Sequence, residues 1–407
     1  METHDVVVVG AGQAGLSLSH ELTRAGREHL VLERGEVGQS WRERWDSFCL
    51  VLPSWTISLP GGRYEGPEPD AFMPRDDFVQ HLVTYARSFD APIREHVTVT
   101  ALDVDGGGTF RLTTSAGQIA AREVVIASGG YQRPHRPPAV AQLSPFVNVL
   151  TITEYSNPGA LAPGKVLVLG SGQSGCQIAE ELREAGREVW LACGRAPWTP
   201  RRLAGHDMMW WLLGSGFMNQ TLADLPSPLA RLIGNPQASG RGGGHDLHYR
   251  TLQALGVTLT GRLRGAEDGR AHFEADLHDS VAFGDGRYRE IRERVAATAA
   301  AKGIPVPELA DPPPFVADPP TAVDLTGFAA AILTAGFRPD YKSWVNLPNA
   351  FDDVGFPLQV DGSSTVVPGL HFMGVHFQRK RKSASLMGVG EDAEVLAERL
   401  TGVGAKN

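Results

Sequence analysis

One ten-residue pattern occurs twice in this 407-residue chain. VVVVGAGQAG spans residues 6–15, and VLVLGSGQSG spans residues 166–175. Each copy runs from an apolar stretch through GxGxxG into an amphipathic segment, which predicts a buried strand, a tight turn and a helix. Glycines in such a turn let the backbone approach a pyrophosphate, and the helix N-terminus attracts its negative charge. The chain is therefore expected to hold two dinucleotides.

The residues after each motif predict two different nucleotides. Glu33 ends the next strand, 18 residues after Gly15, where a carboxylate accepts hydrogen bonds from ribose hydroxyls and repels a phosphate. The second copy has Arg195 at the matching place, 20 residues after Gly175, where a guanidinium suits a 2′-phosphate. A solvent-exposed arginine with no ligand is the alternative for Arg195. We expect FAD in the first site and NADPH in the second, so that a hydride passes between them.

The surrounding pattern predicts an α/β fold with two nested Rossmann-type, three-layer dinucleotide-binding domains. The FAD-binding domain is expected over 1–160 and 330–407, and the NADPH-binding domain over 161–329 with a variable insert at 203–325. The expected strands are 6–9, 29–32, 97–104, 110–114, 124–127, 166–169, 189–192 and 330–334. The expected helices are 14–25, 77–88, 176–185, 287–302 and 392–400.

Composition narrows the partners and the compartment. A net charge of −8 without a long basic stretch argues against nucleic acid. The apolar runs are shorter than the roughly 20 residues of a membrane helix, and the first residues lack a secretory pattern. Three scattered cysteines, Cys49, Cys176 and Cys193, fit a reducing cytoplasm, and the chain has no Cys-x-x-Cys for dithiol reductase chemistry.

Four further segments carry a family resemblance. They are GQSWRERWDS (38–47), VVIASGGYQRP (124–134), ILTAGFRPDY (332–341) and LMGVGEDA (386–393). With the two glycine loops, they make nearly the whole chain resemble class B flavin-containing monooxygenases, in particular bacterial flavoprotein monooxygenases and plant indole-pyruvate monooxygenases. Such enzymes reduce FAD with NADPH and pass one oxygen atom of dioxygen to nitrogen, sulfur or carbon of a small molecule. Oxidative decarboxylation of a 2-oxo acid is one such reaction.

The resemblance also implies the cofactor contacts. For FAD they are Gly10, Gly12, Gln13, Ala14, Gly15, Glu33, Arg34, Gly38, Gln39, Ser40, Trp41, Val99, Ala127, Gly129 and Leu386. For NADPH they are Gly170, Gly172, Gln173, Ser174, Gly175, Arg195 and Arg202.

Two departures from the family pattern leave the catalytic side chains unassigned. Tyr155 of the signature between the glycine loops is kept, but Thr151 stands where the family has a histidine, which weakens a Baeyer–Villiger interpretation. No asparagine precedes Asn148, although many amine and sulfide oxygenases of the family carry one early in the chain. The flavin and NADPH can supply all the reactive groups.

Three other features have competing interpretations. His245 and His248 lack a third ligand nearby, so no metal site is expected. Trp210 and Trp211 could wall a pocket, form a lid, pack in the core or make a homodimer contact. The basic run QRKRKS at 378–383 could attract an acidic substrate or NADPH, but a solvated loop is favoured.

Two alternative functions stay open at this point. One is an NADPH-dependent flavin reductase or oxidase without oxygen transfer. The other is a non-catalytic sensor that binds FAD and NADPH, since fold and cofactor sites alone do not prove chemistry.

Overall fold

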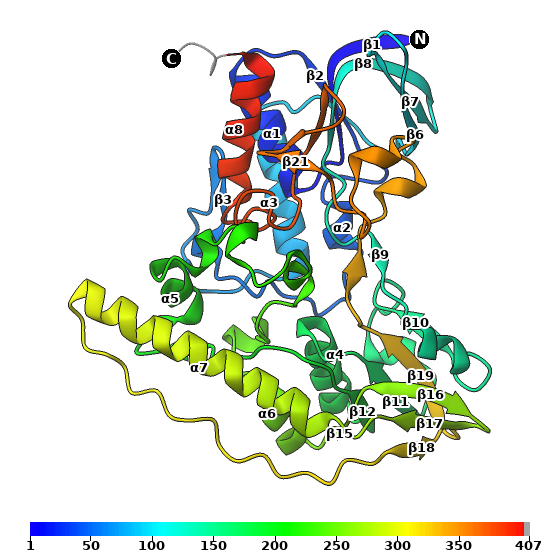
Figure 1. Cartoon of the computed structure of the whole chain (residues 1–407), viewed down its shortest axis with the longest axis vertical. Helices are drawn as coiled ribbons and strands as arrows, with labels where there is room; N and C mark the ends of the chain where they lie inside the picture. The colour runs from blue at the N-terminus through cyan, green and yellow to red at the C-terminus, as the bar shows by residue number, and fades with distance from the viewer. Residues whose placement is uncertain (403–407) are drawn as a thin grey trace.

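The computed structural model describes residues 1–402, which form two lobes stacked along the long axis of the molecule (Figure 1). The upper lobe in this view contains the beginning of the chain and the C-terminal helix, and the lower lobe contains the second glycine-loop unit. Each lobe is built on its own sheet.

The sheet of the upper lobe has nine strands. Its order is β21 (Gln359–Val360), β22 (Ser363–Ser364), β23 (Leu370–Phe372), β8 (Gly117–Ile126), β1 (Glu2–Val9), β2 (His29–Leu32) and β5 (Ile93–Arg94), with β7 (Phe110–Thr114) joining β8 to β6 (Val99–Val104). β1 lies parallel to both β2 and β8. Val6 to Val9 of β1 are buried, as expected for a central strand covered on both faces.

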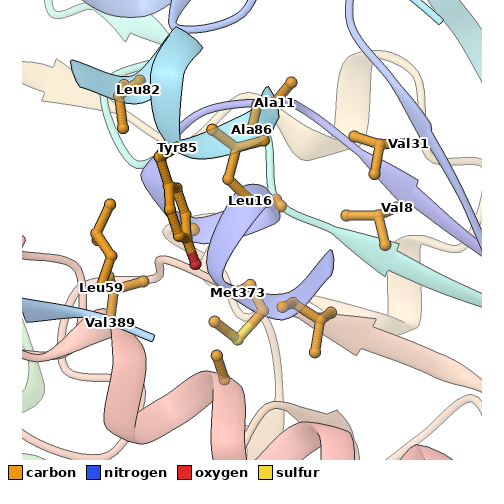
Figure 2. Packing of buried hydrophobic residues seen from close by; sticks show 14 of the residues in the cluster. Val8, Ala11, Leu16, Val31, Leu59, Leu82, Tyr85, Ala86, Met373 and Val389 are labelled. Atoms are coloured by element: carbon orange, nitrogen blue, oxygen red, sulfur yellow. The ribbon is translucent and has the colours of Figure 1, made fainter. Parts of the chain in front are cut away.

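Two different layers cover this sheet. Val8 of β1 packs with α1 (Gln13–Arg24), α3 (Arg75–Ser88) and α8 (Val389–Thr401) on one face, and Figure 2 shows Leu16, Tyr85 and Val389 of these helices gathered there. The alternate residue Val7 packs on the opposite face with the β6–β7 layer.

The sheet of the lower lobe is parallel and five-stranded. Its order is β10 (Val149–Thr151), β19 (Phe328–Leu333), β11 (Lys165–Leu169), β12 (Val189–Ala192) and β15 (Thr258–Thr260). Its two covering layers are, on one face, α4 (Gln173–Glu184) and α6 (Tyr249–Leu255), and on the other, the small sheet of β16 (Leu263–Glu267), β17 (Arg270–Phe273) and β18 (Ala322–Asp324). The predicted fold class, two three-layer dinucleotide-binding units, is confirmed.

The sheet pairing corrects the predicted domain boundaries. β10 and β19 pair with each other, and β19 also pairs with β11, so both strands belong to the lower lobe. The boundary at 160 puts β10 in the FAD-binding domain, and the boundary at 330 divides β19 between the two domains. A buried apolar run such as FAAAIL predicts a central strand but does not say which of two sheets receives it. The chain crosses between the lobes at β9 (Arg133–Pro134) and β20 (Phe337–Arg338), which pair antiparallel.

The insert after residue 203 adds helices that pack around a hydrophobic cluster of their own, which includes Trp211 and Val295. It contains α5 (Met208–Gly214), several short 3₁₀ turns and the long α7 (Leu277–Lys302), which crosses the lower lobe (Figure 1). Three short elements remain outside these layers: α2 (Gln39–Arg42), the ribbon of β3 (Ser58–Leu59) and β4 (Gly62–Arg63), and the ribbon of β13 (Arg202–Leu203) and β14 (His206–Asp207). No helix within residues 1–402 combines the length and apolar character that a membrane crossing requires.

Candidate active site

One large cavity lies between the lobes and is lined by both glycine loops. Its volume is about 1040 Å³, at the upper end of the roughly 300–1,000 Å³ typical of small-molecule sites. Both loops leave the carboxyl ends of parallel strands β1 and β11, which is where open α/β sheets bind nucleotides.

The three glycines of the first loop have three separate roles. Gly10 has φ of 115°, and a Cβ there would lie 2.6 Å from the carbonyl oxygen of Ala127. A Cβ on Gly12 would meet nothing within 4 Å, so this position is open to the cavity. A Cβ on Gly15 would lie 1.9 Å from the carbonyl oxygen of Gly10, so this glycine permits the close packing of α1 on the loop. This division suits a backbone that approaches a pyrophosphate at Gly12.

Glu33 lies at the cavity wall with its carboxylate held in place. The residue is buried, its Oε2 accepts a hydrogen bond from the Ala11 amide at 2.8 Å, and its Oε1 accepts one from the Gly35 amide at 3.1 Å. A carboxylate has about four acceptor positions, so capacity remains for ribose hydroxyls.

The second loop repeats this geometry. Gly170 has φ of 108°, and a Cβ there would lie 2.8 Å from the carbonyl oxygen of Thr334, whereas a Cβ on Gly172 would meet nothing within 4 Å. Arg195 follows β12, lines the cavity and is exposed. It forms no ion pair within the described part of the chain, residues 1–402. A free guanidinium at this point suits a 2′-phosphate.

Most residues predicted to contact cofactors lie together on the wall of this one cavity. They are Gly10, Gly12, Gln13, Ala14, Glu33, Arg34, Ser40, Trp41, Val99, Ala127, Gly129, Leu386, Gly170, Gly172, Gln173, Ser174 and Arg195.

Five of the predicted cofactor contacts do not line the cavity. Gly15 and Gly175 pack against the carbonyls of their own loops, and Gly38 is in the left-handed region and donates its amide to Ala11. The side-chain oxygen of Gln39 accepts from the Glu36 amide. Arg202 points elsewhere, because its guanidinium donates to the carbonyls of Gly243 and Gly244 at 2.7 and 2.9 Å.

Segments distant in sequence meet beside the first loop. The indole N–H of Trp41 donates to Oε1 of Gln13 at 3.0 Å, and Nε2 of Gln13 donates to the carbonyl of Ala384 at 3.4 Å. The amide of Ser58 donates to the carbonyl of Leu386. The contact from Gln13 holds Ala384 against the start of α1, and the contact from Ser58 holds Leu386, a predicted FAD contact, against β3.

Sequence reasoning missed several arginines on the cavity wall, and two of them, Arg44 and Arg381, contact aromatic rings and have no acidic partner within residues 1–402. Arg44 lies beside the paired rings of Tyr131 and Phe337, with its Cζ 5.5 and 5.8 Å from their centres, and burial lowers its pKa. The only sequence feature that pointed to Arg44 was its place in the segment GQSWRERWDS, where no role was assigned to it. Arg381 is the second, and its signal was the basic run QRKRKS.

The prediction that QRKRKS is a solvated loop is wrong for Arg381. Lys380 and Lys382 both pair with Glu391, and Arg379 contacts Asp361 at 3.3 Å. Arg381 alone turns into the cavity wall. A run of like charges in sequence does not show which member the fold turns inward, because that depends on the packing of α8 and the insert.

The remaining candidates take structural positions. Nε2 of His245 contacts Glu180 at 2.7 Å, and His248 caps α6. No group of three metal-ligating side chains occurs among residues 1–402. Trp211 is buried and donates to the carbonyl of Leu203, while Trp210 stacks on His206; neither lines the cavity.

The two signature positions also lie away from the cavity wall. The hydroxyl of Tyr155 donates to Glu181 at 2.9 Å, and Thr151 donates to Glu154 at 2.7 Å. These contacts offer no acid or base to a ligand in the cavity, in keeping with the absence of an assigned catalytic side chain.

Two glycine-loop units that open on one cavity define an oxidoreductase of the two-dinucleotide class. The chain belongs to the pyridine nucleotide-disulphide oxidoreductase family, whose model matches residues 7–212. The predicted resemblance to class B flavin monooxygenases is confirmed by the relatives below.

The chain is also similar to three individual proteins. An oxidoreductase described as CzcO-like from Geobacillus kaustophilus is 31% identical over 394 residues, which cover 96% of this chain and 97% of that protein. The indole-3-pyruvate monooxygenase YUCCA1 of Oryza sativa is 31% identical over 185 residues, covering 44% and 45%. The structure of a flavin-containing monooxygenase from Stenotrophomonas maltophilia superposes with a TM-score of 0.68 at 20% identity, covering 99% of both chains, which shows the shared fold.

Proposed function

We propose that this protein is an NADPH- and FAD-dependent monooxygenase that inserts one oxygen atom of dioxygen into a small organic substrate. The observation that carries the proposal is the single cavity on which both glycine loops open, with Glu33 after one loop and Arg195 after the other. FAD, when bound, supplies the electron transfer and the activation of dioxygen.

The residues of the chain bind and orient the two cofactors. Glu33 accepts from the ribose of the first nucleotide, and the N-termini of α1 and α4 face the pyrophosphates. Arg195 pairs with the 2′-phosphate, which favours NADPH over NADH. Arg44, buried beside the rings of Tyr131 and Phe337 at the junction of the lobes, adds positive charge where the dinucleotides converge.

The insert contributes an apolar wall. Met208, Leu212 and Phe217 line the cavity and belong to one hydrophobic cluster with Met387, which also lines it. Side chains of this kind exclude water from the reacting atoms, which protects the reduced cofactor from unproductive reaction with solvent.

The cysteines argue against disulfide chemistry in this member of the family. Burial raises the pKa of Cys49 to about 11 and raises the pKa of Cys176 and Cys193 further. All three are free in the described chain, and none lines the cavity. Protonated, buried thiols are poor nucleophiles.

A two-stage stopped-flow experiment tests the proposal. The FAD-loaded protein is reduced anaerobically with NADPH and then mixed with aerated buffer while the flavin spectrum is followed. A monooxygenase shows a distinct spectral species that persists before the oxidised spectrum returns, and with a substrate it incorporates one labelled oxygen atom into product. Direct reoxidation with stoichiometric hydrogen peroxide would support the reductase or oxidase alternative, and absence of NADPH turnover would support the sensor.

Our predictions of the cellular compartment and of the oligomeric state rest on the sequence alone. A cytoplasmic location and a homodimer stay predictions, as do a small-molecule substrate and dioxygen as the partners.

A further inference from the structure

Arg381 lies where the insert contacts the segment that precedes Ala384. Its Cζ lies 4.2 Å from the ring centre of Phe217, which belongs to the insert, and 4.9 Å from that of Phe377. Its Nε and Nη2 both donate to Oε1 of Gln220, at 3.3 and 3.1 Å. The side chain lines the cavity, so the remaining N–H groups of the guanidinium are near its interior.

No carboxylate balances this charge. Within residues 1–402, Arg381 has no acidic oxygen at ion-pair distance, whereas Arg379, Lys380 and Lys382 of the same run all have one. Burial, and then the neighbouring charge of Arg294, lower the pKa of Arg381 to about 10, which still leaves it protonated at neutral pH. A partly desolvated cation without a counter-ion is stabilised when an anion binds to it.

The arginine is separate from the two phosphate-binding loops. Its contacts come from the insert and from Phe377, and none comes from a glycine loop or from the strand ends that carry Glu33 and Arg195. It lines the same cavity as Ala384, which accepts a hydrogen bond from Gln13, and Leu386, a predicted FAD contact. The cofactor phosphates are assigned to the two glycine loops, so Arg381 is left for another ligand in this cavity.

The surroundings of Arg381 are apolar and restrained. Phe217, Met218, Phe377 and Met387 line the cavity around it. Phe377 has φ of 56°, a left-handed conformation that is rare for an aromatic residue and that the surrounding structure must hold in place. Such strain is most often found where a side chain is positioned for a ligand.

We infer that Arg381 anchors the negatively charged group of the substrate, which is a carboxylic acid with an apolar body packed against Phe217 and Phe377. This inference rests on the proposed function, because it takes the cavity beside Leu386 as the substrate site. Acidic substrates were one open alternative from the sequence, and the inference adds the specificity-determining residue, Arg381, that would select them.

A pair of probes that differ only in charge tests the inference without turnover. Phenylacetate and the neutral phenylacetamide are titrated into the FAD-loaded protein with NADP⁺ present, and the perturbation of the flavin spectrum gives each dissociation constant. We expect phenylacetate to bind about tenfold to a hundredfold more tightly, since a charge-assisted hydrogen bond contributes that much. Equal affinities for the two probes, or no perturbation by either, would overturn the inference with no variant needed.

Matched variants assign the effect to this residue. Arg381→Gln is expected to remove the preference for phenylacetate, and Arg381→Lys to restore part of it, because lysine keeps the charge but not the planar fork. Arg289→Gln, an exposed arginine on α7, removes the same charge far from the cavity wall and should leave the preference unchanged. FAD content and thermal unfolding establish that each variant is folded.

Two outcomes separate this inference from others. If Arg381→Gln weakens NADP⁺ binding and leaves the phenylacetate preference intact, the arginine holds the dinucleotide and the inference is wrong. If the preference depends on Arg381 but no oxygen transfer occurs in the stopped-flow experiment, the acid site stands while the proposed function fails.

Discussion

Alanine at the first and second glycines of each loop should produce opposite defects. At Gly10, alanine must adopt φ of 115° and place its Cβ 2.6 Å from a backbone oxygen of Ala127. The backbone strain costs about 1–3 kcal/mol and the overpacking a similar amount, so Gly10→Ala should lose about 2–6 kcal/mol of unfolding free energy. This is a large part of the roughly 5–15 kcal/mol that stabilises a typical native protein.

At Gly12 the backbone is compatible with alanine. Its φ is −83°, and the added Cβ meets no protein atom within 4 Å, so Gly12→Ala should cost at most about 1 kcal/mol. The methyl group instead enters the space that we assign to the pyrophosphate, and FAD affinity should fall about tenfold or more. Gly172→Ala should likewise raise the KM for NADPH while FAD content stays normal.

Chemical denaturation of the apoprotein and FAD titration of each variant separate the two defects. The reasoning fails if Gly10→Ala is as stable as the wild type, or if Gly12→Ala binds FAD normally. The same holds if Gly172→Ala affects FAD and not NADPH, because the two loops would then have exchanged their assigned cofactors.

Three further predictions follow from single residues. Arg195→Gln should raise the KM for NADPH about tenfold or more and leave that for NADH unchanged in steady-state assays; equal effects on both would mean that Arg195 does not contact the 2′-phosphate. Asp285→Ala should lower the unfolding free energy by about 3–5 kcal/mol in denaturant titrations, because it leaves Arg250 and the indole N–H of Trp198 without their buried partner, and a loss below about 1 kcal/mol would contradict this. Burial lowers the pKa of His371 to about 4, so between the unfolded value of about 6.5 and pH 4 the unfolded chain binds the extra proton and stability falls as pH falls. His371→Asn should flatten that decline in unfolding free energy, and an unchanged pH profile would show that His371 does not cause it.

The two glycine-loop units were predictable because local chemistry determines them. The strands predicted at 29–32 and 189–192 have those bounds in the structure, since each is a short, largely apolar run that follows a helix-ending glycine. Gly12 and Gly172 also lie where the motif requires them.

Features that depend on tertiary packing were not predictable. α7 begins at Leu277, whereas the sequence predicted a helix only from residue 287. The prediction was too short because Gly284 and Gly286 disfavour a helix in isolation. In the fold, Gly284 lets the helix approach Trp198, whose ring is 3.0 Å from a Cβ placed there. The inward turn of Arg381 likewise depends on Phe217 and Gln220, about 160 positions earlier in the chain.

The central claim is that both dinucleotides bind in one cavity so that a hydride passes between them. Anaerobic mixing of the FAD-loaded protein with increasing NADPH tests it most directly, with loss of oxidised-flavin absorbance as the readout. The account predicts complete reduction in one turnover, at a rate that saturates with NADPH and saturates only at higher concentration with NADH. Flavin that stays oxidised, or a rate that rises without saturation for both nucleotides alike, would contradict it.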